Sequence, residues 1–97
     1  MRRIILVPLS LIAVALVPAG AADTCIPDWS IAAPIVHREG LTTVEALSRI
    51  AADKLPGSIV RTTLCQADGA FVYRLLVRDA QGRLSSRTVD ARTPFGR

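Results

Sequence analysis

The stretch that decides the fold is AFVYRLLVRD, residues 70–79, in which large apolar side chains occupy every second position. Successive side chains of a β-strand point to opposite faces, so this alternation predicts a strand with one buried face. The side predicted to be buried is wholly large and apolar and consists of Phe71, Tyr73, Leu75 and Val77. The other side mixes aliphatic and basic residues, namely Val72, Arg74, Leu76 and Arg78. We expect the first set to face a helix.

Two further β-rich stretches flank this strand, SIVRTTLCQ at residues 58–66 and RLSSRTVD at residues 83–90. The connections QADG and DAQG are short, and each ends in a glycine that can adopt a positive φ. Short connections of this kind favour an antiparallel meander of three strands.

The same alternation assigns faces in the two outer strands. In the first strand we expect the core side to hold Val60, Thr62 and Leu64, and the opposite side to hold Ile59, Arg61, Thr63 and Cys65. In the third strand Leu84 and Val89 have opposite parity, so both can face inward only with a bulge. Keeping Arg87 out of the core predicts Leu84, Ser86 and Thr88 inside, with Val89 outside.

The clearest helix lies in TTVEALSRIAADKLPG, residues 42–57. Thr42 followed by Glu45 fits a capping box, which makes Thr42 the predicted N-cap, and Pro56-Gly57 predicts an end near Leu55. Its apolar stripe consists of Val44, Leu47, Ile50, Ala51 and Leu55. The predicted fold is therefore α+β, with one helix packed on a three-stranded antiparallel meander in the order α-β-β-β, over residues 41–97.

The N-terminal segment has the layout of a secretory signal peptide at residues 1–22. Two arginines precede an apolar run, and the small residues after it allow cleavage after Ala21 or Ala22. The alternative is an uncleaved membrane anchor, although the run of about 16 residues falls short of the roughly 20 that a span needs. Cleavage predicts a periplasmic or extracellular protein. Residues 23–40, with Pro27 and Pro34, are expected to form an irregular arm.

The charge and cysteine content narrow the function classes further. Without the two leader arginines the 12 basic residues of the 97-residue chain fall to 10 against 8 acidic ones, which leaves a net charge of about +2 and no basic run for nucleic acid. In an oxidising compartment Cys25 and Cys65 predict a structural disulfide, worth roughly 4 kcal/mol for a loop of about 41 residues. A metal pair or a catalytic thiol is the alternative.

The region from Leu41 to Ala91 resembles the PepSY domain family. The motifs that carry the likeness are an EAL helix at residues 45–47, a Pro-Gly stop, an Asp-Gly turn, a VYxxxVxD strand at residues 72–79, and VDA at residues 89–91. The family usually continues into a glycine turn and a short strand, whereas this chain has RTPFGR with Pro94, so a final strand is not expected.

The resemblance implies a compact α+β unit with the helix across an antiparallel sheet. PepSY units occur in propeptides of thermolysin-like metalloproteases and in exported envelope proteins of bacteria, where inhibition or regulation of peptidases is their suggested role. The family brings no catalytic residues. On this basis we expect a small exported binding module that regulates or inhibits a peptidase or an envelope signalling protein.

The residues themselves predict no enzyme, metal site or cofactor. His37 is a lone histidine beside charged neighbours, and Ser85 and Ser86 lack a nucleophile elbow. The aspartates fall at turns, where side-chain bonds to nearby backbone explain them: Asp68, Asp79 and Asp90.

The candidate site is instead the open face of the predicted sheet. It consists of Arg61, Arg74, Arg78 and Arg87, mixed with Val72 and Leu76. Three interpretations stay open: a solvated face, a docking surface for an acidic protein partner in the cell envelope, and, as the alternative function, a surface that binds anionic lipid or polymer. A Cys25–Cys65 bridge would also tether the arm with Ile26, Trp29 and Ile31 over Val72 and Leu76.

Overall fold

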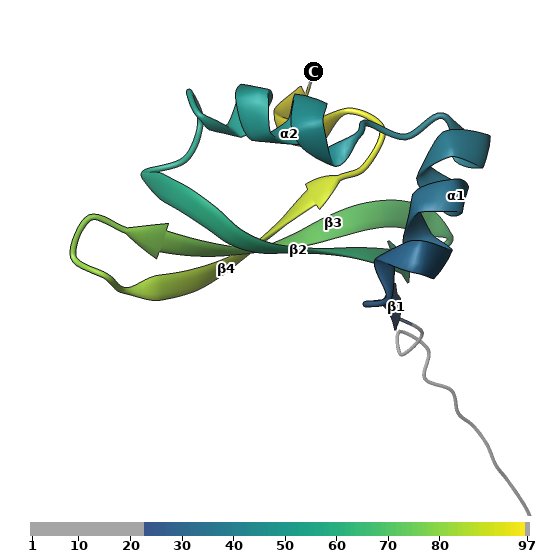
Figure 1. Cartoon of the computed structure of the whole chain (residues 1–97), viewed down its shortest axis with the longest axis horizontal. Coiled ribbons are helices and arrows are strands. Elements are labelled where there is room, and N and C mark those ends of the chain that lie inside the picture. The colour runs from purple at the N-terminus through teal and green to yellow at the C-terminus, as the bar shows by residue number, and fades with distance from the viewer. Residues whose placement is uncertain (1–22, 97) are drawn as a thin grey trace, which may run out of the picture.

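A computed structural model describes residues 23–96, and the predicted signal peptide at residues 1–22 lies outside them. The described residues form two α-helices and a four-stranded antiparallel sheet, which confirms the α+β class but adds a helix and a strand to the prediction. In chain order the elements are β1 (Thr24–Ile26), α1 (Trp29–Glu39), α2 (Val44–Ala51), β2 (Gly57–Ala67), β3 (Ala70–Asp79), β4 (Leu84–Asp90) and the short 3₁₀ helix η2 (Pro94–Gly96) (Figure 1).

The sheet has the strand order β1-β2-β3-β4, so each strand pairs with the next one in the sheet. The two predicted turns are confirmed. Asp68 (φ 51°) and Gly69 (φ 80°) form a two-residue connection between β2 and β3, and Gly82 (φ 79°) lies in the connection between β3 and β4. The added strand, β1, pairs with the last part of β2, where Cys25 lies directly opposite Cys65.

The expectation of an irregular arm at residues 23–40 was wrong, because helix α1 occupies 11 of these residues. The carboxylate of Asp28 caps its first turn by accepting from the backbone N–H of Ser30, and Gly40 (φ 67°) ends it in the left-handed conformation. Pro34 lies inside the helix on its exposed side, where water can reach the carbonyl that loses its partner. Burial of Ala32 and Val36 on the other side offsets that loss.

Helix α2 confirms the second helix pattern but not its limits. Thr43, rather than Thr42, is the N-cap and accepts from the N–H of Ala46. Thr42 is held by the sheet instead: its N–H donates to the Ala91 carbonyl, and its own carbonyl accepts from the Tyr73 hydroxyl. The helix ends at Ala51, four residues before Leu55, and the chain continues in tighter turns to β2.

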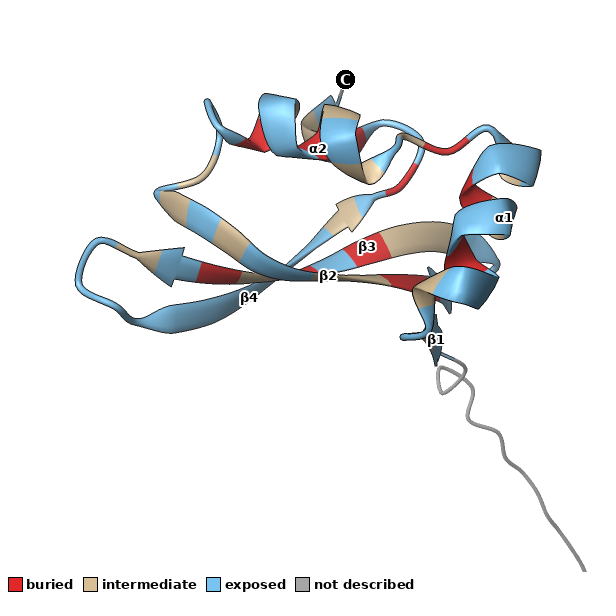
Figure 2. Cartoon of the chain, viewed as in Figure 1, coloured by how far each residue is buried: buried red, intermediate tan, exposed pale blue. Residues whose placement is uncertain are grey.

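Both helices cover the same face of the sheet, and the core lies between the two layers (Figures 1 and 2). The predicted inner side of β3 is confirmed, because Tyr73, Leu75 and Val77 are fully buried and Phe71 packs at the rim of the core. The buried cluster consists of Ala32, Val36, Leu41, Leu47, Leu64, Tyr73, Leu75, Val77 and Ala91. No helix between residues 23 and 96 lies on the opposite face.

A bulge in β2 changes the predicted faces at its start. The pairing runs Ile59 with Val77 and then Arg61 with Leu76, so Val60 is an extra residue without a partner on β3. Ile59 therefore packs against the core, and Val60 is 43% exposed, the reverse of the prediction. Beyond the bulge the predicted parity holds, with Leu64 opposite Tyr73 inside.

The predicted faces of the third predicted strand, now β4, were also wrong. Val89 pairs with Tyr73 and packs against the core, whereas Leu84 pairs with Arg78 on the open face and is 56% exposed. Ser86 and Thr88 share the open face with Leu84, since they pair with Leu76 and Arg74. After β4 the chain forms the 3₁₀ helix η2, in which Pro94 is buried. No further strand follows β4 within the described residues.

Candidate functional site

The open face of the sheet carries most of the predicted site residues. One row across β2, β3 and β4 runs Arg61, Leu76, Ser86, and another runs Ser58, Arg78, Leu84. Arg74 and Val72 lie further along β3 on the same side. We call six residues the open-face patch: Arg61, Val72, Arg74, Leu76, Arg78 and Leu84. The sequence prediction misses Leu84, because side-chain parity assigns that residue to the core.

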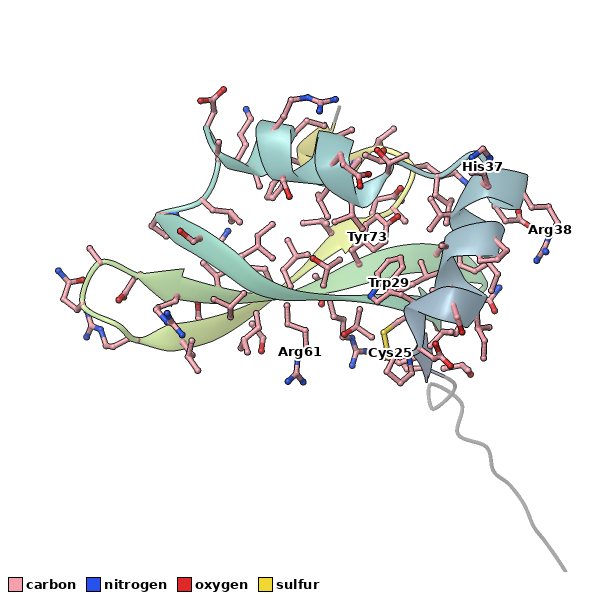
Figure 3. All side chains as sticks on the ribbon, in the orientation of Figure 1. Cys25, Trp29, His37, Arg38, Arg61 and Tyr73 are labelled. Atoms are coloured by element: carbon pink, nitrogen blue, oxygen red, sulfur yellow. A yellow bond between two sulfur atoms is a disulfide. The ribbon has the colours of Figure 1, made fainter. Side chains whose placement is uncertain are left out.

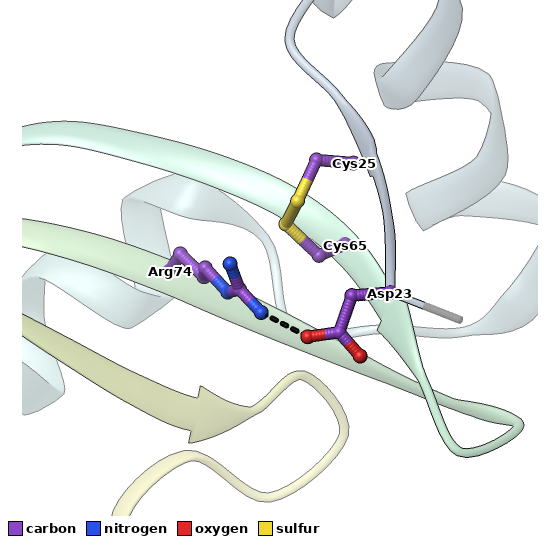
Figure 4. Close-up of a disulfide and its surroundings, with 4 residues drawn as sticks. All are labelled: Asp23, Cys25, Cys65 and Arg74. Carbon is purple, nitrogen blue, oxygen red and sulfur yellow. Dashed lines mark hydrogen bonds and ion pairs between the residues drawn. A yellow bond between two sulfur atoms is a disulfide. The ribbon is translucent and has the colours of Figure 1, made fainter. Parts of the chain in front are cut away.

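The three arginines of the open-face patch differ in their surroundings. Arg74 forms an ion pair with Asp23, next to the disulfide (Figure 4). Arg61 and Arg78 make no ion pair with any residue between 23 and 96, and Arg61 points away from the helices into solvent (Figure 3). The patch therefore offers two cationic groups without an ion-pair partner in the described part of the chain, together with the aliphatic side chains of Val72, Leu76 and Leu84.

Arg87 does not belong to this patch, contrary to the prediction. Its partner on β3 is the buried Leu75, so it projects from the helix side of the sheet. The residue is nevertheless exposed, as are all residues of β4 from Leu84 to Thr88. An arginine can take a core-facing parity here because β4 is the last strand and neither helix packs over this part of it.

The predicted disulfide between Cys25 and Cys65 is confirmed, and it lies on the open face at the β1 edge of the sheet. The arm does not fold over Val72 and Leu76, however. The Trp29 indole N–H donates to the Thr62 carbonyl at 3.1 Å, and its ring lies 6.4 Å from that of Tyr73 on the helix side. Ile31 points to solvent with 55% exposure. Val72 and Leu76 are left half-buried, with no arm across them.

The residues considered for catalysis do not form a site in the described part of the chain. His37 is exposed in the last turn of α1, and Ser85 and Ser86 are exposed on β4. No cluster of three or more potential metal ligands occurs within residues 23–96. Neither of the helices described is long and apolar enough to cross a membrane.

A surface hollow of about 410 Å³ lies between α2 and the start of β2. None of its lining residues carries an ionisable side chain; they are Ser48, Ala51, Ala52, Gly57, Ser58 and Ile59. Gly57 is required there, because a Cβ would stand 2.0 Å from the Arg78 carbonyl oxygen. The hollow offers shape but no group for acid–base or nucleophilic chemistry.

Two of the turn aspartates act on the backbone, as predicted. Asp90 accepts from the N–H groups of Thr93 and Arg92, and these bonds lower the pKa of its carboxyl. Asp79 accepts from the N–H groups of Gln81 and Arg83 and so shapes the β3–β4 turn. Both carboxylates thus have structural partners.

Comparison with known proteins adds no relative, since no family model, curated protein or solved structure matches the chain.

Proposed function

We propose that the chain is an exported, non-enzymatic PepSY-like module that binds a protein partner in the cell envelope and so regulates or inhibits a peptidase or a signalling protein. The PepSY-like motifs between Leu41 and Ala91 support the family part of this proposal. The signal-peptide pattern of residues 1–22 and the Cys25–Cys65 disulfide support export, because disulfides persist in oxidising compartments.

The observation that carries the proposal is the composition of the open-face patch. Arginine is enriched and lysine depleted in protein interfaces, and the buried centre of an interface is more apolar than the surrounding surface. The open-face patch combines arginines with aliphatic side chains and has no lysine. Leu84 is 56% exposed beside Arg78, and Leu76 is half-buried between Arg61 and Ser86. A partner with acidic groups around a small apolar patch would complement this surface.

Anionic lipid or polymer is the weaker occupant of the same surface. Each basic residue near a membrane surface contributes about 1 kcal/mol, so stable binding needs a cluster of them. Arg74 is already paired with Asp23, and Arg87 lies on the other side of the sheet. Only Arg61 and Arg78 remain on the patch, which is too few for that mode.

The test is crosslinking in intact envelopes with a charge-reversed pair and a matched control. Arg61→Glu with Arg78→Glu should abolish a stoichiometric crosslink that survives moderate salt. Arg38→Glu with Arg49→Glu changes the net charge equally on the helices and should keep that crosslink. The captured partner is then assayed as a peptidase, or for signalling output, with and without one equivalent of the chain.

Two outcomes would count against this function. Loss of the crosslink in both double variants would show a general charge effect rather than a docking surface. Binding to anionic vesicles that disappears at moderate salt, without any protein crosslink, would favour the lipid alternative.

A further inference from the structure

The most exposed element of the described chain is β4. Five consecutive residues, from Leu84 to Thr88, are exposed on both sides of the sheet. Strand β4 is also the last in the sheet, so its outer edge faces no other strand within residues 23–96. An edge strand of this kind presents a row of unpaired backbone groups to solvent.

The hydrogen bonds at the two ends of β4 show which backbone groups point outward. The N–H of Ala91 donates to the Phe71 carbonyl, and the carbonyl of Arg83 accepts from the N–H of Asp79. Odd-numbered residues therefore bond to β3, because inward and outward groups alternate along an antiparallel strand. The backbone N–H and C=O groups of Leu84, Ser86 and Thr88 consequently face away from the sheet.

Within residues 23–96 this edge has no bulge, no proline and no covering segment to prevent strand addition. The β3–β4 pairing runs from Val72 opposite Asp90 to Arg78 opposite Leu84 without a bulge, and β4 contains no proline. Bulges, prolines and covering segments are the common protections of edge strands. Arg83 is paired with Asp79, so Arg87 is the charge on this strand that repels a basic segment and favours an acidic one.

We propose that β4 accepts an extended acidic segment of a protein partner as a fifth, antiparallel strand. This inference rests on the proposed function and names the part of the partner that binds. Strand addition supplies main-chain hydrogen bonds, and alternate side chains supply specificity. An acidic residue opposite Arg87 on the helix side, and an aliphatic residue near Leu84 on the open face, would match the two surfaces.

A second copy of the chain is a poorer occupant of this edge. When two β4 strands pair antiparallel over their full length, Ser85 meets Val89 and Arg87 meets Arg87 of the other copy. Like charges directly opposite each other destabilise a strand pair. An acidic segment replaces that repulsion by attraction.

The probe is a blocked nine-residue peptide of alternating glutamate and valine, added to the full chain purified from exporting cells. Peptide binding should slow amide hydrogen exchange at Leu84, Ser86 and Thr88. The exchange rates of the amides on the outer edge of β2 should not change. Ser86→Pro removes one outward N–H and no bond to β3, so it should weaken binding at least tenfold. Ser86→Ala keeps the N–H and should bind like the wild type.

Backbone-methylated peptides test the same point without altering the protein. In the antiparallel arrangement the valine N–H groups face β4, so methylation of the valine nitrogens should weaken binding at least tenfold. Methylation of the glutamate nitrogens should leave it unchanged. Equal affinity of the two methylated peptides overturns the proposal, as does protection of the β4 amides that rises with protein concentration alone, which would identify a second copy.

The envelope crosslink separates failure of this inference from failure of the proposed function. If Ser86→Pro and Ser86→Ala capture the same partner equally, the partner binds elsewhere and strand addition is wrong while the function stands. If the wild-type chain captures no partner, the proposed function itself fails.

Discussion

The two outer edges of the sheet are finished in different ways. At the first edge β1 pairs with the end of β2, the Cys25–Cys65 disulfide locks that pair, and the Trp29 indole bonds to the next outward carbonyl, that of Thr62. The bulge at Val60 then bends the rest of β2. At the second edge β4 has neither bridge, bulge nor cover within the described residues.

We therefore expect the β1 edge to contribute to stability and the β4 edge to contribute to recognition. The buried cluster lies under the helices and extends to the β1 edge through Ala32, Val36 and Leu64. From β4 only Val89 packs against it. Substitutions at the covered edge should therefore change the free energy of unfolding, and substitutions between Leu84 and Thr88 should change binding alone.

The largest expected effect is removal of the disulfide. Cys25→Ser with Cys65→Ser should lower the free energy of unfolding by about 4 kcal/mol, because the unfolded chain regains the entropy of a loop of about 41 residues. Amide exchange that requires global unfolding should become faster throughout the sheet, and the increase should be largest in β1 and around Trp29. Unchanged exchange around Trp29 would contradict the role given to the covered edge.

A pair of leucines compares the two edges directly. Leu64 is fully buried opposite Ile26 of β1, so Leu64→Ala should cost about 3 kcal/mol through lost burial and a cavity. Leu84 is 56% exposed on β4, and Leu84→Ala should change stability by less than about 0.5 kcal/mol. Chemical denaturation of both variants measures the contrast, which disappears if β4 is buried in a stable oligomer.

The alkaline limb of stability should report Tyr73 at the covered side. Burial raises the pKa of Tyr73 to about 12, above its ordinary value of 10. Folding therefore favours the neutral phenol, so this contribution is complete below pH 10 and is lost as the pH rises through 12. Relative to Tyr73→Phe, the wild type should lose about 2 kcal/mol by pH 12. Parallel pH curves for the two proteins would be the contrary result.

The smallest effect concerns the indole bond at the first edge. Trp29→Phe keeps an aromatic ring near Tyr73 but leaves the Thr62 carbonyl without its donor, which should cost about 1 kcal/mol. Exchange at the β2 edge should increase while β4 stays unchanged. If the variant gains affinity for the glutamate–valine peptide, the indole also prevents strand addition at the β2 edge, in addition to its packing role.

The sequence predicts the middle of the sheet well and its margins poorly. In β3 one side is uniformly large and apolar, so parity alone identified Tyr73 and Leu75 as core. Val60 shows the limit of this method, since a single bulge reverses every assignment before it. In β4 the rule that arginine avoids the core side assigns Arg87 to the wrong face, because both faces of this edge strand are exposed to solvent.

The arm and the candidate site depart from the prediction for physical reasons of the same kind. Pro34 predicts a broken helix, but a capped start, a glycine end and two buried side chains outweigh one missing hydrogen bond. Five of the six predicted site residues do share the open face, and Arg87 does not. The Arg74–Asp23 pair could not be anticipated, because it depends on β1 joining the sheet.

The cross-strand disulfide also bears on the order in which the protein is made. Cys25 leaves the ribosome 40 residues before Cys65, and β1 has no partner until the end of β2 has followed it. The chain contains two cysteines, so only one intramolecular bridge is possible. The only mispairing left to the chain is with another molecule, and its yield should depend on the concentration of reduced chains where the bridge forms.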